Sequence, residues 1–347
     1  MNMEKKFDVV IGNPPYQKEA TGDATHAMPI YHKFMEAAYE VGSKAVLITP
    51  ARFLFDAGYT PKAWNETMLS DRHLSVPYYE PNSNDLFPGT DIKGGIAVTY
   101  RDEKRDGEPI GTFTKYPELN EILHKVMSQD HSSLIEAGIS SGRSYRYTDV
   151  MHADNPQAAA VLSSGHQYVI GTHAFQRTPF LFHDGIPNDG KKYSVVLGLD
   201  GKKRARRWVC SDYISGPDAL DKFKVAVTAA NGSGQLGEAL SSPLVVEPNV
   251  AVTQTFLTIG SFSNETEAND CLKYVKSKFA RVMLGVLKVT QHNPAKVWKY
   301  VPLQDFTGKS DIDWSKSIPE IDEQLYKKYG LSASEIDFIE SNVKAMD

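Results

Sequence analysis

A short apolar run that leads directly into two prolines constrains this chain more than any other feature. Residues 9–11 read Val-Val-Ile and are followed by Gly12, a pattern typical of a buried strand in a parallel sheet. Pro14 and Pro15 then fix two φ angles and remove two backbone donors, so the carbonyl oxygens of this loop lack local partners. Because open α/β sheets place active sites in loops at the carboxyl ends of their strands, we expect a functional site in this loop.

The residues around the prolines suit a nucleobase that carries an exocyclic amino group. Such a group is a poor nucleophile because its lone pair is delocalised into the ring. The Asn13 side-chain oxygen and the Pro14 carbonyl oxygen can each accept one of its N–H bonds, which frees the lone pair for attack on a methyl sulfonium. Tyr16 offers an aromatic face for a base extruded from a duplex. A Pro-Pro turn capped by Asn, with no catalytic role, is the alternative interpretation.

At these residues the chain resembles the N6-adenine DNA methyltransferases of restriction–modification systems. It is most similar to the type IIG group, in which the methylase and a target-recognition region share one chain. The segment Asn13–Tyr16 matches the catalytic motif of that family. Further segments match in the family's order, and these are Tyr31–Phe34, Lys44–Pro50, Phe87–Pro88, Asp91–Gly95, Gln291–Asn293 and Trp298–Leu303.

The resemblance implies a fold, a reaction and a set of site residues. The expected fold class is α/β, with a partial Rossmann-like methyltransferase half, then a mixed α/β target-recognition domain and a short helical tail. Catalysis is assigned to Asn13, Pro14, Pro15 and Tyr16, and Tyr16 also stacks on the flipped adenine. Double-stranded DNA is the implied substrate, and S-adenosyl-L-methionine is the implied methyl donor. Phe87 is a candidate for the second stacking surface, with a core Phe in a turn as the alternative.

Local patterns divide the chain into four parts. A helix over 29–42, between strands at 9–11 and 45–48, predicts a right-handed βαβ unit, and 96–100 reads as a further strand. We expect residues 1–105 to form the C-terminal half of a methyltransferase catalytic domain, 106–130 a connecting helix, 131–305 a DNA target-recognition domain, and 306–347 a tail with helices over 318–329 and 334–344.

The region after the connecting helix is predicted to be rich in strands. Short apolar runs at 168–171 and 193–197, separated by turn residues, read as strands. Asn264 and Glu267 predict the N-cap and capping box of one long helix, and Ser332 is a candidate cap in the tail. The inner face of the long helix is expected to carry Ala268, Leu272, Val275, Phe279, Val282, Met283 and Val286.

Composition excludes several classes of protein. The chain has 347 residues, of which 41% are hydrophobic and 23% charged, so it is long enough for two globular domains and is not a disordered chain. Its formal net charge of −5 means that DNA binding must rely on local basic patches. Cys210 and Cys271 are its two cysteines, too few for a disulfide framework, and there is no signal peptide or transmembrane-length segment. We therefore expect a cytoplasmic protein.

Two basic segments are candidates for DNA contacts. The denser one lies in a predicted strand–turn–strand and consists of Lys202, Lys203, Arg204, Arg206 and Arg207. The other is a polar loop with Arg143 and Arg146, whose guanidinium groups suit phosphates or guanine. Solvated surface segments of the same composition are the alternative for both.

The cofactor-binding element of the family is not evident in this sequence. In chains with this motif order, a strand and a glycine-rich turn precede the catalytic loop, but twelve residues precede Asn13 here, fewer than a βαβ unit of about thirty needs. The glycine cluster at 231–237 lacks a strand that feeds a helix, and it reads as a surface loop. We therefore expect that the S-adenosyl-L-methionine-binding half is missing, and that a partner chain carries the cofactor-binding strands or an endonuclease.

The sequence leaves three functions open. The first is the catalytic-loop and target-recognition part of an adenine methyltransferase that is incomplete alone. The second is a non-catalytic, sequence-specific DNA-binding protein with an idle catalytic loop, and the third is one half of a split methyltransferase. The histidines and cysteines show no metal-ligand spacing, and the carboxylates near 218–224 are too compressed for a nuclease site, so neither site is predicted.

Overall fold

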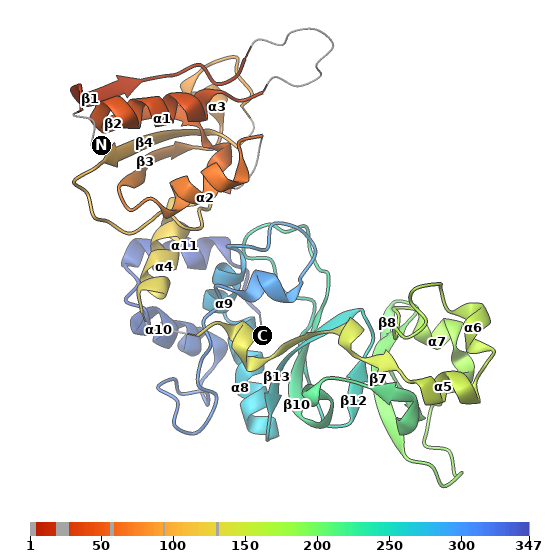
Figure 1. The fold of residues 1–347 in the computed structure, drawn as a ribbon. Helices are drawn as coiled ribbons and strands as arrows, with labels where there is room; N and C mark the ends of the chain where they lie inside the picture. Colours follow the sequence, from red (N-terminus) through yellow and green to blue (C-terminus); the bar gives the residue numbers. More distant parts are fainter. Residues whose placement is uncertain (1–4, 19–27, 56–58, 93, 130–131, 347) are drawn as a thin grey trace. The chain divides into compact units, whose positions relative to one another are not determined.

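The computed structural model describes residues 5–18, 28–55, 59–92, 94–129 and 132–346. The chain forms two compact units, Met1–Asn120 and Glu121–Asp347 (Figure 1). The finer four-part division expected from the sequence stays a prediction. Within the described ranges, no helix has the length and apolar character needed to cross a membrane.

The N-terminal unit is built on one four-stranded mixed sheet with the order β1-β2-β4-β3. Its strands are β1 (Phe7–Gly12), β2 (Gly42–Pro50), β3 (Leu74–Glu80) and β4 (Ile96–Asp102), and its helices are α1 (Tyr31–Val41), η1 (Ala51–Phe55), α2 (Lys62–Ser70) and α3 (Ser83–Leu86). The strands β1 and β2 run parallel with α1 between them, as predicted, and β4 pairs antiparallel with both β2 and β3. Helix α2 and strand β3 were not predicted from the sequence.

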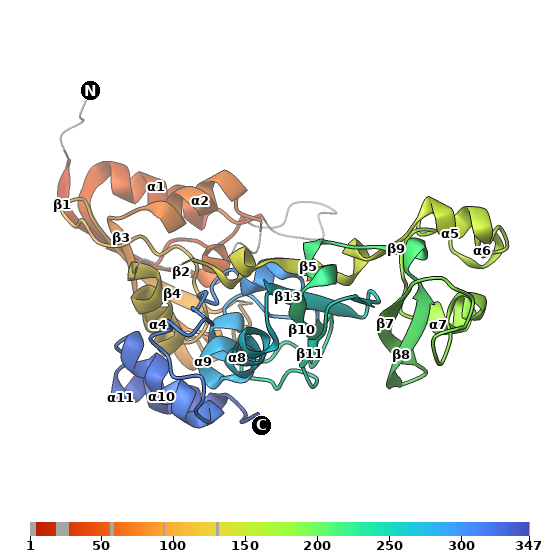
Figure 2. The ribbon, with the colours of Figure 1, turned by 90° about the horizontal axis from the view of Figure 1, so that it is seen from below.

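Helices α1 and α2 cover the same face of this sheet (Figure 2). Tyr31, Met35 and Ala38 of α1 pack against β2 and against Trp64 of α2. Phe34 lies outside this buried stripe, and its side chain is 44% exposed. The helix starts at Tyr31 rather than at Pro29.

The opposite face of the sheet is apolar at β1, and the described residues leave it uncovered there. The register pairs Val10 with Ala45 and Ile11 with Val46, so alternate residues of β1 point away from α1. Those residues are Phe7, Val9 and Ile11, with exposed fractions of 56%, 46% and 77%. The prediction of a buried strand was therefore wrong for the side with Phe7, Val9 and Ile11, and only the Val10 side of β1 packs against the core. In the described sheet β1 is an edge strand whose only neighbour is β2.

The C-terminal unit is a mixed α/β structure with three small sheets, ordered β11-β10-β13-β5, β12-β7-β8 and β6-β9. The strands are β5 (Ile139–Ser141), β6 (Arg146–Tyr147), β7 (Tyr193–Asp200), β8 (Lys203–Cys210), β9 (Ile214–Ser215), β10 (Phe223–Thr228), β11 (Leu244–Val246), β12 (Val250–Val252) and β13 (Phe256–Phe262). The predicted strand at 193–197 is confirmed as part of β7. The one predicted at 168–171 is wrong, because its pairing is limited to a single bridge between Val169 and Arg146.

The helices of this unit begin with α4 (Pro117–Ser128), which the two units share, and continue with η2 (Leu134–Ala137), η3 (Gly142–Ser144), α5 (Asp149–Asp154), α6 (Ala158–Val161), α7 (Ala174–Arg177), η4 (Pro179–Leu181), η5 (Ser211–Tyr213), η6 (Asp218–Asp221), α8 (Glu265–Lys276), α9 (Lys278–Leu284), η7 (Ala295–Trp298), α10 (Ile318–Lys328) and α11 (Ala333–Asn342). The short helices α5 to α7 gather around β7 and β8 in both views (Figures 1 and 2).

The predicted long helix is divided in two at Ser277. Asn264 caps α8 as expected, since its side chain accepts a hydrogen bond from the Glu267 N–H at 2.9 Å. Ser277 then leaves the helical conformation (φ −58°, ψ 150°), and its hydroxyl caps α9 by accepting from the Ala280 N–H at 3.1 Å. The apolar stripe nevertheless continues across the break, because Phe279 and Val282 are both buried. The tail helices α10 and α11 confirm the prediction.

Candidate functional site

The loop after β1 is held at its far end by the segment that leads into α1. The Tyr16 carbonyl accepts a hydrogen bond from the Ile30 N–H at 3.0 Å, and the Lys18 N–H donates to the Met28 carbonyl at 3.0 Å. Strand β1 fixes the near end through its pairing with β2. The two prolines therefore span a short stretch of backbone that is anchored on both sides.

Within this stretch three successive carbonyl oxygens are left without partners from the described residues. The carbonyl oxygens of Asn13, Pro14 and Pro15 accept no hydrogen bond there, and Asn13 and Pro15 are exposed. The Tyr16 hydroxyl is buried and has no hydrogen-bond partner among the same residues. Burial raises the pKa of Tyr16, and the neighbouring Asn13 side chain acts in the opposite direction. The ring of Tyr16 is thus fixed in place while the acceptors beside it remain available.

A pocket of about 660 Å³ opens at this loop, where β1 and β2 end. It is lined by Asn13, Pro14, Pro15, Tyr16, Gln17, Pro29, Tyr31, Pro50, Arg52, Tyr59, Asp91 and Ile92. The volume lies within the range of about 300–1,000 Å³ that is usual for small-molecule sites. The four residues predicted to be catalytic therefore share one wall of a pocket at the carboxyl end of the parallel strands.

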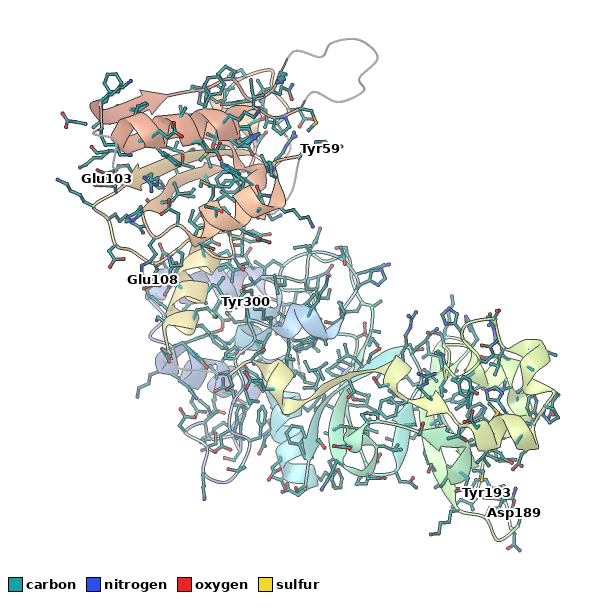
Figure 3. All side chains as sticks on the ribbon, in the orientation of Figure 1. Tyr59, Glu103, Glu108, Asp189, Tyr193 and Tyr300 are labelled. Carbon is teal, nitrogen blue, oxygen red and sulfur yellow. The ribbon has the colours of Figure 1, made fainter. Side chains whose placement is uncertain are left out.

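Two other tyrosines line the pocket, and they differ in exposure. Tyr31 is 2% exposed, and burial raises its pKa to about 12. Tyr59 is 56% exposed and lies at the margin of the N-terminal unit, on the side of the loop that follows β1 (Figure 3). Tyr59 was not predicted from the sequence, because it follows η1 without any local pattern that would relate it to Asn13.

Phe87, the predicted second stacking residue, does not line this pocket. It ends α3, where its N–H donates to the Ser83 carbonyl at 2.8 Å and its carbonyl accepts from the Thr90 hydroxyl at 2.8 Å. The segment that follows it does reach the pocket through Asp91 and Ile92; Lys93 of that segment lies outside the described residues.

Gly95 fixes the turn that brings this segment to the pocket. Its φ is 79°, in the left-handed region, and a Cβ at this position would lie 2.3 Å from the Glu80 carbonyl oxygen. Its own carbonyl accepts a hydrogen bond from the Ala51 N–H at 3.0 Å, just after β2. A side chain at this position would therefore force the turn away from both β2 and β3.

The predicted strand–turn–strand with its basic residues is confirmed as the β7–β8 hairpin, but its arginines have partners within the chain. Arg204 donates to the Ser241 and Ser242 carbonyls and lies 5.6 Å from the Phe256 ring centroid. Burial lowers the pKa of the Arg204 guanidinium. Arg206 pairs with Glu247 at 2.9 Å, and Arg207 pairs with both Asp184 and Asp200.

The other residues predicted to contact DNA have fewer partners among the described residues. Lys202 and Lys203 are exposed at the tip of the hairpin, and neither takes part in an ion pair among the described residues. Arg146 lies over the ring of Tyr168 at 5.6 Å, and Arg143 lines a separate small pocket of the C-terminal unit. The DNA-binding role of all seven cations stays a prediction.

Comparison with known sequences bears on the N-terminal unit. The model of the Eco57I restriction-modification methylase family matches residues 1–87. That region includes the whole Asn13–Tyr16 loop. An uncharacterized adenine-specific methylase of Mycoplasma pneumoniae is 32% identical over 122 residues, which is 34% of this chain and 29% of that protein. The resemblance to restriction–modification methylases is thereby confirmed. The match spans less than a third of the relative's length.

Two solved structures align with most of the chain at low similarity. The type IIG restriction endonuclease BpuSI shares 12% identity over 96% of this chain and 53% of its own, with a TM-score of 0.35. The type IIL restriction-modification enzyme MmeI, solved in complex with DNA, shares 11% identity over 96% of this chain and 56% of its own, with a TM-score of 0.34. Scores this low do not establish a shared fold.

The family implies S-adenosyl-L-methionine as the methyl donor, and a glycine-rich turn with free backbone amides would help to hold it. The one glycine cluster considered for that role, at 231–237, is closed by the carboxylate of Glu238. That carboxylate accepts hydrogen bonds from the Ser233 N–H, the Ser233 hydroxyl and the Gly234 N–H at 2.8–3.0 Å. The amides of Ser233 and Gly234 are therefore occupied by a carboxylate of the same loop.

Proposed function

We propose that this chain is the catalytic-loop and target-recognition part of a site-specific N6-adenine DNA methyltransferase of a restriction–modification system. The observation that carries the proposal is the pocket in which Asn13, Pro14 and Tyr16 meet, with acceptors that the fold leaves open. The N-terminal sheet would be the Rossmann-like half of the catalytic domain, and the C-terminal unit would recognise the DNA target.

In this proposal the loop prepares the adenine amino group for attack. The target adenine, extruded from the duplex, places its amino group between the Asn13 side-chain oxygen and the Pro14 carbonyl oxygen. Each oxygen accepts one N–H, and the nitrogen lone pair becomes available for the electrophile. Tyr16 stacks on one face of the base, and Tyr59, which lines the same pocket, replaces Phe87 as the proposed second aromatic surface.

The methyl donor supplies an electrophilic methyl group on a sulfonium, and a further protein segment would hold it. The apolar residues Phe7, Val9 and Ile11 on the open face of β1, together with the free edge of that strand, support this part of the proposal. A parallel strand added beside β1 would extend the β1–β2 pattern and bring its own carboxyl end next to Asn13. That segment belongs either to a longer polypeptide or to a partner chain.

Methyl transfer with the cofactor-binding segment present tests this function. Labelled S-adenosyl-L-methionine is incubated with unmethylated duplex DNA, and the digested nucleosides are identified by mass spectrometry. We expect N6-methyladenine, and Asn13→Ala should lower its formation by at least about 100-fold, the usual loss when one preorganised transition-state hydrogen bond is removed. Asn269→Ala, an exposed asparagine of α8, is the matched control. Methylcytosine as the product, or full activity of Asn13→Ala, would contradict the proposal.

A further inference from the structure

We propose that a small pocket in the C-terminal unit, formed around Arg143 and Arg177, binds a phosphate group of the DNA backbone. The pocket has a volume of about 210 Å³, and its polar lining includes Ser163, His166 and Gln254. This inference rests on the proposed function, since DNA is the ligand that brings the phosphate. Of the polar residues in this pocket, only Arg143 was singled out in the sequence.

The side chain of Arg143 projects from a turn whose backbone is closely packed. It lies in η3 directly after Gly142, where a Cβ would come within 2.3 Å of the Thr253 carbonyl oxygen and 2.5 Å of the Phe256 carbonyl oxygen. The Ser141 hydroxyl accepts a hydrogen bond from the Arg143 N–H at 3.3 Å. The backbone is thus pressed against two neighbouring carbonyls, while the Arg143 side chain is exposed.

Arg177 reaches the same pocket from the end of α7, and a hydrogen bond positions it. Its Nη1 donates to the Ser163 hydroxyl at 3.1 Å. The Ser163 carbonyl in turn accepts from the His166 N–H at 2.9 Å, which ties the two residues into one turn. The backbone of Gln254 is held in place because its N–H donates to the Ile170 carbonyl at 2.9 Å. The donors of the pocket therefore come from three separate segments that the fold brings together.

The charge of this pocket is what distinguishes it from the β7–β8 hairpin. Its lining holds two guanidinium groups and one imidazole but no carboxylate. In the described part of the chain the Arg143 guanidinium makes no ion pair, whereas Arg206 and Arg207 are both neutralised by carboxylates. Two guanidinium groups that line one pocket match the several oxygens of one phosphate.

The size of the pocket agrees with a single group rather than a whole small molecule. Its volume falls below the range of about 300–1,000 Å³ that is usual for small-molecule sites. The half-buried side chains of Leu162 and Val169 form the apolar part of the lining. A guanine edge, whose O6 and N7 also accept from arginine, is the competing ligand that the experiment has to separate.

Titration with inorganic phosphate tests the pocket itself. The His166 ring resonances, assigned with His166→Gln, are followed by NMR in the full chain. We expect a saturable shift that the double variant Arg143→Gln/Arg177→Gln loses and that Arg206→Gln keeps. No shift in the wild type, or the same shift in the double variant, would overturn the proposal.

Binding to duplex DNA at several salt concentrations separates phosphate from base. A phosphate contact predicts that the double variant weakens binding equally for all sequences and lowers the slope of log K against log salt by about one per arginine that contacts a phosphate. Weakening confined to one sequence would indicate a base edge and overturn the phosphate assignment. If the wild type binds no duplex DNA, the proposed function fails, and the phosphate titration still decides the pocket.

Discussion

The loop after β1 and the β7–β8 hairpin carry the two most conspicuous motifs of the sequence. They differ in whether their polar groups have partners within the chain. In the loop, the carbonyls of Asn13, Pro14 and Pro15 have no partner among the described residues. In the hairpin, Arg204, Arg206 and Arg207 are all engaged by other parts of the same chain. Residue types alone therefore do not show which groups are available to a ligand.

The difference has two physical causes, the missing backbone donor of proline and the length of the arginine side chain. A proline removes the donor that would satisfy a neighbouring carbonyl, and a carbonyl cannot move to find another. An arginine side chain is long and carries five N–H donors, so it finds carbonyls or carboxylates on adjacent segments. We therefore expect substitutions of engaged groups to change stability, and substitutions of open groups to change binding.

The largest effect is expected at Asp322, a buried carboxylate that is engaged by the backbone of another helix. It is buried in α10 and accepts the N–H groups of Lys278 and Phe279 at the start of α9, at 3.0 and 2.8 Å. Asp322→Ala leaves both donors without a partner and should cost about 3 kcal/mol in the free energy of unfolding, measured by urea denaturation. A loss below about 0.5 kcal/mol would show that these two hydrogen bonds contribute little to stability and would contradict the prediction.

The pH dependence of stability gives a second view of the same carboxylate. Burial raises the pKa of Asp322 to about 6, against an ordinary value of 3.8. Between these values the folded chain binds more protons than the unfolded chain, so the Asp322 contribution makes stability fall as pH rises from about 4 to 6. Asp322→Asn should remove this decline, and an unchanged pH profile would contradict the assignment.

At the open loop, Tyr16 is expected to affect binding rather than stability. Tyr16→Ala should weaken adenosine binding by about 1–3 kcal/mol, the usual contribution of one base–aromatic stack. Tyr16→Phe is the matched control, because the hydroxyl has no partner among the described residues and only the ring is needed. Equal loss in both variants would mean that the hydroxyl, and not the ring, contacts the base.

Arg204 tests the expectation for a hairpin arginine that has partners within the chain. Arg204→Ala should lower the free energy of unfolding by about 1–2 kcal/mol, because the Ser241 and Ser242 carbonyls lose their donor and Ser242 is held at a φ of 44°. The salt dependence of DNA binding should stay unchanged. A shallower salt dependence at unaltered stability would return Arg204 to the DNA contacts predicted from the sequence.

Lys202 and Lys203 should give the smallest change, and in binding alone. Replacing each with Gln is expected to reduce the slope of log K against log salt by about one for every DNA phosphate that the lysine neutralises. Because both are exposed, the free energy of unfolding should change by less than about 0.5 kcal/mol. An unaltered slope would show that the tip of the hairpin does not contact DNA.

The sequence predicted best what depends on neighbouring residues. Asn264 and Ser332 cap their helices through backbone groups three residues away, and the strand–helix–strand order follows from local periodicity. The break at Ser277 was missed because the apolar stripe runs through it without interruption. The start of α1 was expected at Pro29 and lies at Tyr31, whereas the Ile30 N–H donates to the Tyr16 carbonyl.

The same limit applies to the candidate site. The sequence identified Asn13 to Tyr16 because they are contiguous. Tyr59 and Arg177 reach their pockets from distant segments, and nothing in the sequence around them relates them to Asn13 or Arg143. Phe87 lies close in sequence to the segment that reaches the pocket, yet Phe87 itself stays at the end of α3.

The central claim is that the fold leaves the acceptors of the Asn13–Tyr16 loop open for a base amino group. Saturation-transfer NMR of the chain with adenosine and with thymidine, which lacks the amino group, tests it without any partner or cofactor. We predict that adenosine binds more tightly than thymidine, and that Asn13→Ala removes this difference without changing the unfolding transition. Equal binding of both nucleosides, or a preference for adenosine that survives Asn13→Ala, would contradict the claim.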